Sequence, residues 1–229
     1  PKGSEVILPA MTYCSTLFSL LRCNLKPILV DIDKNTSTIS VNEIKKKITK
    51  KTKLIILVHL YGDMPNLSEI NKILVGKNIQ IIEDASQAHG AFDYSSKKPI
   101  KSGSYGIINC FSLYPGKNLG AYGDAGIITT NNKSKANYIK KFRNIGSDKK
   151  FYHDLVGVNS RLDTIQAAIL IRKLKELNKH NSRRKKIAKI YSKNINNKNF
   201  KKLDYSTGCV FHQYVIKTKK INKFLKYLG

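Results

Sequence analysis

The sequence predicts an α/β fold built around a mostly parallel central sheet. Short apolar runs rich in Ile, Leu and Val alternate along the chain with segments whose apolar residues recur at helical spacing. The run Leu54–Leu60 is apolar on both faces, as in a strand that other layers cover on each side. Strands and helices that alternate in this way are typical of a parallel sheet with connecting helices.

Each expected element has a local signal. Glu5–Pro9 is an apolar run that ends at a proline, and Thr12 is a candidate cap for the helix that follows. Further strands are expected at Lys26–Asp31, Leu54–Tyr61, Ile79–Asp84, Tyr105–Ser112 and Gly126–Thr130, with a strand-like segment at Val210–Ile216. Helices are expected at Thr12–Arg22, Val41–Thr49, Asn66–Leu74, Ser134–Arg143 and Leu162–Lys189.

The chain is strongly basic, with 42 Lys and Arg against 15 Asp and Glu and a net charge of +27. Such a charge favours a nucleic-acid-binding module as one class of function. The lysines are scattered along the whole chain, however, and no motif that reads RNA or DNA is present, so we expect no nucleic-acid partner. A basic surface also attracts an anionic small substrate such as a nucleotide-linked sugar. We interpret the basic run Arg183–Lys186 as a solvated helix face.

No segment predicts membrane insertion or export. The apolar runs are shorter than the ~18 residues that a membrane span needs, and Pro1–Glu5 lacks the apolar region of a signal peptide. The four cysteines form no CxxC pair and have no histidine at metal-binding spacing. These features predict buried free thiols, no metal site and a cytoplasmic protein.

Polar clusters lie at or near the ends of expected strands, at Glu83–Gly90, Phe111–Lys117 and Tyr122–Gly126. Ligands of open α/β sheets bind at the carboxyl ends of the strands. A lysine amine and a carboxylate there suit pyridoxal phosphate (PLP), which needs an amine for covalent attachment and a carboxylate against its ring nitrogen. Taken singly, Lys117 is typical of a solvated surface charge and Asp84 of a helix cap or turn. The patterns of phosphate loops and dinucleotide sites are absent.

Several sequence blocks together resemble the DegT-type family of PLP-dependent nucleotide-sugar aminotransferases. They are VILPAMTY, PILVDID, VHLYG, IIEDASQAHGA, FSLYPGKNLGAYGDAGIITTN and VGVNSRLDTIQAAIL. The resemblance implies the type I PLP-dependent transferase fold, similar to aspartate aminotransferase. It also implies a PLP-binding large domain at 1–175 and the beginning of a small C-terminal domain at 176–229. Relative to the family, the chain is expected to lack N- and C-terminal parts.

The resemblance implies four roles at the centre of the site. Lys117 would carry PLP covalently and then act as general base and acid. Asp84 would pair with the ring nitrogen, and Gln87 would reach the ring oxygen. Ser112 would donate its hydroxyl to the cofactor phosphate.

Two further roles carry alternatives. Tyr13 would stack on the ring, or else it is a core residue. Asn159 would reach the phosphate of a neighbouring subunit's cofactor, which makes a homodimer part of the site, or else it is a turn or cap residue. His59 and His89 are expected to be structural.

The implied reaction is amino transfer to a keto carbon of a nucleotide-diphosphate sugar, with glutamate as the expected donor, in amino-sugar biosynthesis for surface polysaccharide. The GDAG and GVNSRLDTIQAAIL strings favour a 3-keto sugar, although 4-keto members share most blocks. A dehydratase of the same fold has histidine in place of the lysine, so Lys117 argues against it. The alternative is a catalytically inactive fragment or a remnant that binds PLP or a sugar nucleotide.

Overall fold

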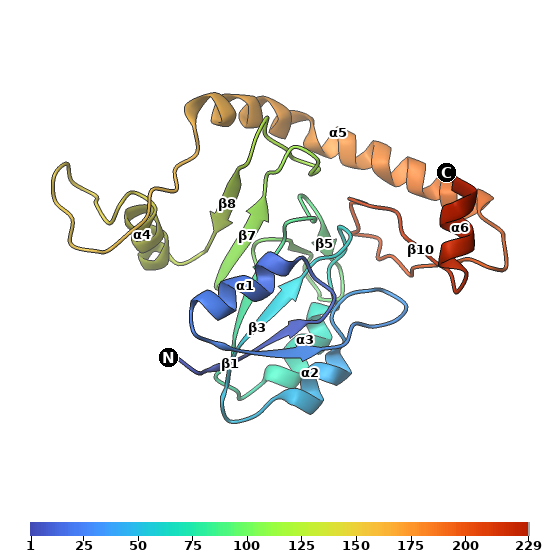
Figure 1. Cartoon of the computed structure of the whole chain (residues 1–229), viewed down its shortest axis with the longest axis horizontal. Helices are drawn as coiled ribbons and strands as arrows, with labels where there is room; N and C mark the ends of the chain where they lie inside the picture. The colour runs from blue at the N-terminus through green and yellow to red at the C-terminus, as the bar shows by residue number, and fades with distance from the viewer. Residues whose placement is uncertain (229) are drawn as a thin grey trace.

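The computed structural model describes residues 1–228 and has a six-stranded sheet at its centre, in the order β2-β1-β3-β4-β7-β8 (Figure 1). The strands β2, β1, β3, β4 and β7 are parallel, and β8 runs antiparallel to β7 at the edge. The predicted α/β fold with a mostly parallel sheet is therefore confirmed. The bounds are β1 Glu5–Pro9, β2 Lys26–Val30, β3 Thr52–Val58, β4 Gln80–Asp84, β7 Ile108–Ser112 and β8 Gly126–Thr129.

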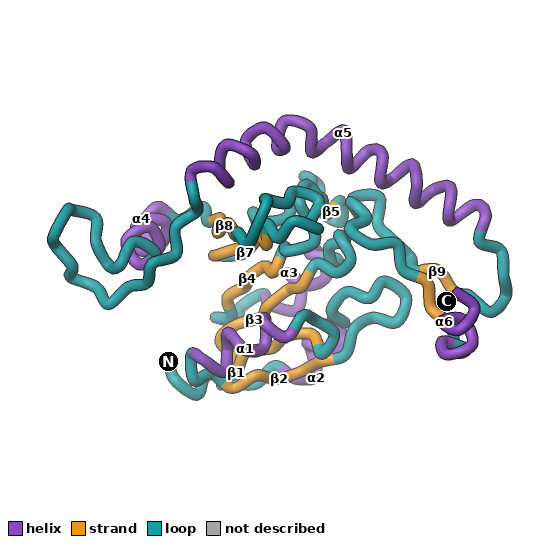
Figure 2. The backbone as a smooth tube through the Cα atoms, turned by 45° about the horizontal axis from the view of Figure 1, so that its top comes forward, coloured by secondary structure: helices purple, strands orange, loops and turns teal. Residues whose placement is uncertain are grey.

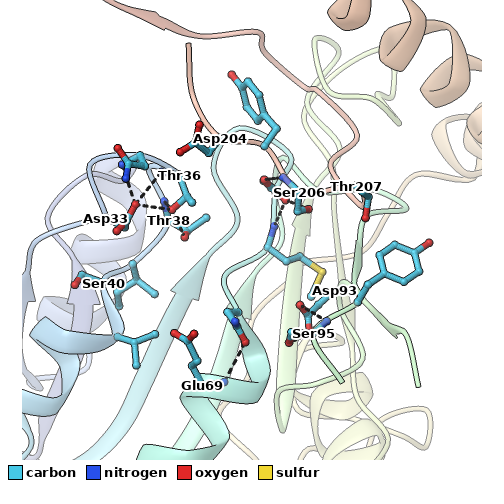
Figure 3. A pocket seen from close by; sticks show the side chains of 18 of the residues that line it. Asp33, Thr36, Thr38, Ser40, Glu69, Asp93, Ser95, Asp204, Ser206 and Thr207 are labelled. Atoms are coloured by element: carbon cyan, nitrogen blue, oxygen red, sulfur yellow. Dashed lines mark hydrogen bonds between the residues drawn. The ribbon is translucent and has the colours of Figure 1, made fainter. Parts of the chain in front are cut away.

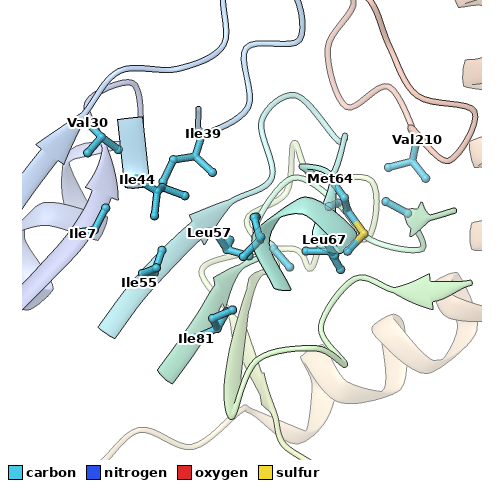
Figure 4. Packing of buried hydrophobic residues seen from close by; sticks show 14 residues of the cluster. Ile7, Val30, Ile39, Ile44, Ile55, Leu57, Met64, Leu67, Ile81 and Val210 are labelled. Carbon is cyan, nitrogen blue, oxygen red and sulfur yellow. The ribbon is translucent and has the colours of Figure 1, made fainter. Parts of the chain in front are cut away.

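Helices cover both faces of the sheet. Successive strand residues point to opposite sides, so each face of these apolar strands carries side chains that a helix can bury. Ile7 and Ile55 pack with α2 (Val41–Lys47) and α3 (Leu67–Leu74) in the larger buried cluster, which Figure 4 shows. Their neighbours Leu8 and Ile56 pack against α1 (Cys14–Arg22) on the other face. The apolar strands are thus buried from both sides, as the run at Leu54–Leu60 predicted.

Side-chain caps fix where three helices begin. Ser40 Oγ accepts the Glu43 amide at 3.3 Å at the start of α2, and Asn66 Oδ1 accepts the Glu69 amide at 3.0 Å at the start of α3. Asn132 does the same for α4 (Lys133–Phe142). Each cap satisfies a backbone donor that the helix leaves unpaired.

The helix α5 spans Thr164–Asn194 and passes over the sheet at the end where the parallel strands finish (Figures 1 and 2). Its buried residues recur at helical spacing, which explains why one helix serves as a long cover. These residues are Leu170, Leu177, Asn181 and Ala188. The predicted boundary between residues 175 and 176 falls inside this continuous helix, and the division into two domains stays a prediction.

Short elements complete the chain, namely β5 Phe92–Asp93, β6 Ile100–Lys101, β9 Lys201–Lys202, β10 Ile216–Lys217 and α6 Ile221–Leu228. The strand expected over Val210–Ile216 is wrong except at its last residue. The amides of this segment bind outside any sheet instead, because Val210 donates to Gly62 O and Val215 to the Tyr205 hydroxyl. Within residues 1–228, no helix combines the length and apolar character that a bilayer crossing requires.

Candidate active site

A cavity of about 430 Å³ opens where β3, β4 and β7 end. The cavity is lined by residues from three separate parts of the sequence, namely Lys117, Asp84, Gln87, Ser112 and Tyr13. The other lining residues are Thr12, Ser15, Val58, His59, Leu60, Ser86, Tyr114 and Asp124. The residues that the strand-end argument singled out therefore meet at one edge of the sheet.

Lys117 lies in a loop between β7 and β8 that is closed by its own backbone. The Lys117 amide donates to Tyr114 O at 2.9 Å, and the Ala121 amide donates to Leu113 O at 2.7 Å. Gly120 has no side chain because a Cβ there would collide with the Pro115 carbonyl. Leu113 is fully buried and anchors the loop. The loop thus holds Lys117 at the cavity without a helix or strand of its own.

Partial burial changes the chemistry of the Lys117 amine. Loss of solvation lowers its pKa below 10.5, and the nearby Asp84 carboxylate opposes this by favouring the charged form. The net direction is downward, so a larger fraction of the amine is neutral than on a solvated lysine. A neutral amine is both a nucleophile and a base.

Asp84 is the last residue of β4 and is held by two donors. The Thr16 hydroxyl donates to Oδ2 at 2.7 Å, and the Ser86 amide donates to Oδ1 at 3.2 Å. Thr12 Oγ1 lies 2.8 Å from Thr16 Oγ1, so a hydroxyl pair from the start of α1 backs the carboxylate. Sequence reasoning missed Thr16. Its only signal is the spacing of four residues from Thr12, which puts both on one side of the helix expected over Thr12–Arg22, although the observed α1 begins at Cys14.

The remaining predicted cofactor residues at the cavity differ in their contacts within the chain. They are Gln87, Ser112 and Tyr13. Gln87 Oε1 is buried and, among residues 1–228, has no hydrogen-bond partner. Ser112 Oγ accepts the Tyr114 amide at 3.3 Å. The Tyr13 ring is 74% exposed, so the alternative that it is a core residue is wrong. A buried amide without a partner at a cavity fits a bound polar ligand, and the amine and carboxylate beside it fit the donor set of PLP.

Asn159 lies apart from this cavity. It is exposed, sits between α4 and α5, and forms an isolated antiparallel bridge with Asn144. A role toward a second subunit needs such an exposed position, but a turn residue would be exposed as well. Its assignment stays a prediction.

Comparison with known proteins decides the family. The model of the DegT/DnrJ/EryC1/StrS aminotransferase family matches residues 1–228. The chain belongs to this family. It is 42% identical to the dTDP-3-amino-3,6-dideoxy-alpha-D-galactopyranose transaminase of Aneurinibacillus thermoaerophilus and 40% identical to a pleiotropic regulatory protein of Geobacillus stearothermophilus. Each alignment covers 99% of this chain and 62% of the relative, so the chain spans about three-fifths of their length.

A solved structure of the E. coli GDP-4-keto-6-deoxy-D-mannose-3-dehydratase with bound hydrated PLP is also similar. It has a TM-score of 0.91 and 26% identity, and the alignment covers 100% of this chain and 64% of that one. The predicted type I fold is therefore confirmed. One fold serves both an aminotransferase and a dehydratase here, so the site residues must decide the reaction.

Behind Asp84, this DegT/DnrJ/EryC1/StrS member has a fully buried carboxylate. Glu83 accepts hydrogen bonds from His59 Nε2 at 2.7 Å and from three backbone amides at 2.7–3.0 Å, those of Gly103, Tyr105 and Gly106. Burial alone would raise the pKa of Glu83, but the hydrogen bonds from His59 and the amides outweigh it and lower the pKa. His59 is thus engaged by Glu83, which fits the structural role expected for it.

A second cavity, of about 620 Å³, lies between the loop after β2, the loop before α3 and residues 204–207 (Figure 3). Three of its five acids are engaged by hydrogen bonds within the chain. Asp33 accepts the Asn35 and Thr36 amides, Asp63 accepts the Ser206 amide and hydroxyl, and Asp93 accepts from Ser95. The contacts at Asp63 join the C-terminal segment to the loop before α3, so Asp63 has a structural role.

His89 and His212 make stability depend on pH. Burial lowers the pKa of each to about 4, from 6.5, and the Lys117 charge adds to the effect. Between pH 6.5 and 4 the unfolded chain binds protons that the folded chain does not. The stabilisation is therefore complete above pH 6.5 and is lost as pH falls toward 4, by up to ~1.4 kcal/mol per pH unit for the buried His89 and by less for the half-buried His212, which solvent screens.

We expect His89→Phe to flatten this dependence, as measured by urea unfolding at a series of pH values from 4.5 to 7.5. The exposed His180→Gln on α5 serves as the matched control and should leave the slope unchanged. An unaltered slope in the folded His89→Phe variant would contradict the prediction.

Proposed function

We propose that this chain binds PLP through Lys117 and supports transfer of an amino group from glutamate to the keto carbon of a nucleotide-diphosphate sugar. The observation that carries the proposal is the meeting of Lys117 and Asp84 at one cavity where the Gln87 amide oxygen has no partner within residues 1–228. The bound cofactor would supply an aldehyde that links to amines and a ring that accepts electrons from the substrate carbon.

Lys117 carries the proton chemistry in this proposal. Its lowered pKa provides a neutral amine, which can attack a carbonyl carbon. Once displaced by the incoming amino group, the same Nζ atom can take a proton from the substrate carbon and return it elsewhere. The closed loop supports this role because it fixes the backbone of Lys117 beside the cavity that the side chain lines.

The other residues bind and orient. Asp84, held by Thr16, would keep a proton on the ring nitrogen. The Gln87 amide would donate from Nε2 to the ring oxygen, and its buried Oε1 would face the polar atoms of the bound ligand. Ser112 would donate to the phosphate. Tyr13, exposed at the start of α1, would cover the ring face.

The substrate proposal rests on family relatives and on charge. The A. thermoaerophilus relative is named for a 3-amino sugar, which supports a 3-keto substrate. A net charge of +27 attracts a diphosphate. Retention of Lys117 favours amino transfer over dehydration. We also propose a homodimer, in which Asn159 reaches the neighbouring cofactor phosphate, and a cytoplasmic role in building amino sugars for surface polysaccharide.

Reduction of the protein with borohydride in the presence of PLP tests the proposal directly. We expect the pyridoxyl mass on the peptide that contains Lys117, because this amine combines burial with a lowered pKa. The variant Lys117→Arg keeps the positive charge and should lose the adduct, as judged by peptide mass mapping. An adduct on another lysine, or one spread over exposed lysines, would sink the assignment.

A further inference from the structure

One face of α5 contacts the loop that carries Lys117 at several points; we call this face the α5 stripe. Leu170 and Leu177 pack on Leu113, Leu119 and Ala121 in a separate buried cluster. The stripe also binds polar groups of the loop: Gln166 accepts the Tyr122 amide at 2.8 Å, and Lys173 donates to Gly120 O. Residues 166, 170, 173, 177 and 181 follow helical spacing, so a single face of α5 supports the loop.

Asn181 lies at the end of this stripe and is buried. Its Nδ2 donates to His89 O at 2.8 Å, and its Oδ1 accepts Asn118 Nδ2 at 3.0 Å. His89 follows Asp84 by five residues, and Asn118 directly follows Lys117. One side-chain amide therefore links the segment after β4 to the loop after β7. A side chain with only donors or only acceptors could not bind both.

Asn118 extends the link to the C-terminal segment. Its Nδ2 also donates to Val210 O at 3.2 Å, and its Oδ1 accepts from His212 Nδ1 at 3.2 Å. Arg184, the next residue of the α5 stripe, lies within 3.4 Å of His212 O. The basic run interpreted as a solvated helix face thus includes two residues that hold this segment, since Lys185 also donates to Thr207 O.

We propose that Asn181 is a positioning residue, which sets the place of Lys117 relative to Asp84 by acting through Asn118. The catalytic meaning of this inference rests on the proposed function. The geometric claim does not, because every contact in it belongs to the chain alone. Loss of Asn181 would free the residue next to Lys117 from α5 and let the amine move into solvent.

The test is the pH profile of Lys117 labelling by acetic anhydride in the PLP-free protein, followed by peptide mass spectrometry. The midpoint of this profile reports the amine pKa, whereas accessibility alters only the plateau. In the wild-type protein the midpoint should lie below the ordinary 10.5. In Asn181→Leu it should rise by at least about 0.5 pH unit, because a more solvated amine favours its charged form.

None of the ionisable groups around the amine is itself replaced in this test. They are Asp84, Tyr13, His59, Tyr114 and Asp124 at the cavity, with His89 and His212 behind the loop. Asn178→Leu, at an exposed position on the same helix, is the matched control and should leave the midpoint unchanged.

A double-variant cycle separates positioning from general loosening. Asn118→Ala and the pair Asn118→Ala with Asn181→Leu should each shift the midpoint about as far as Asn181→Leu does, because the two residues act in one link. An unchanged midpoint in folded Asn181→Leu overturns the proposal, and so do fully additive shifts. If Asn181→Leu does not fold, an unchanged midpoint in Asn118→Ala, at a half-buried position, has the same force. Failure of PLP to attach to Lys117 would overturn the proposed function and leave this result standing.

Discussion

Replacement of Lys117 by alanine is expected to lower the rate of amino transfer by at least about 10⁴-fold. In the proposed mechanism the substitution removes both the amine that would attach the cofactor and the general base, and a positioned base alone contributes roughly 10²–10⁴-fold. The measurement is kcat with glutamate and a 3-keto nucleotide sugar. We expect KM to change little by comparison, because the amine acts on the reacting atoms more than on sugar or nucleotide binding.

Two comparisons make this result specific. Lys98→Ala removes an exposed lysine from a loop outside the cavity and should keep wild-type kcat. Added methylamine supplies a free amine and should restore part of the activity of Lys117→Ala. Retention of more than about a tenth of the activity in Lys117→Ala, which is far above the loss expected for a missing base, would refute the role of this residue.

Glu83→Ala should produce the largest loss of stability, about 3–5 kcal/mol in the free energy of urea unfolding. Glu83 is fully buried and accepts four hydrogen bonds. Loss of its carboxylate would leave His59 and three backbone amides without a partner. Each buried polar group left without its partner costs about 1–3 kcal/mol, so several of them together reach this size. Glu176→Ala is the control, since its surface contact with Lys179 at 3.6 Å should contribute less than ~0.5 kcal/mol.

The stability of the protein at low pH provides a second test of the role of Glu83. The pKa of Glu83 is lowered in the folded protein from 4.5. Its contribution is therefore present above pH 4.5 and is lost as pH falls through the lower folded value. Equal stability of Glu83→Ala and wild type at pH 7 would show that the hydrogen bonds around this carboxylate have been overestimated.

Sequence periodicity predicted the sheet and its helices because the pattern of burial and the helix caps depend on residues close together in the sequence. The strand at β3 was expected to reach Tyr61 but ends at Val58. Apolar character continues past that point, since Leu60 is buried outside the ladder. The apolar run at Val210–Ile216 misled for the same reason. Burial can be read from composition, whereas the choice of hydrogen-bond partner depends on the tertiary fold.

The site divides in a similar way. Lys117 and Asp84 could be found because strand ends in parallel sheets converge, and the resemblance then singled out Gln87, Ser112 and Tyr13. Thr16 and Asn181 could not be found, because their importance lies in partners 68 and 92 residues away. Asn159 stays a prediction because its proposed partner is another subunit.

The link from Asn118 to α5 has a consequence for the order of folding. Asn118 meets residues 63 and 92 positions further along, whereas β3 and β4 are joined by a short connection through α3. Closing a longer loop costs more entropy, and distant contacts form late. A growing chain can therefore assemble much of its sheet while Lys117 still lacks its support from Asn181 and Val210. We therefore expect the cavity around Lys117 to be among the last parts of the molecule to take its native shape.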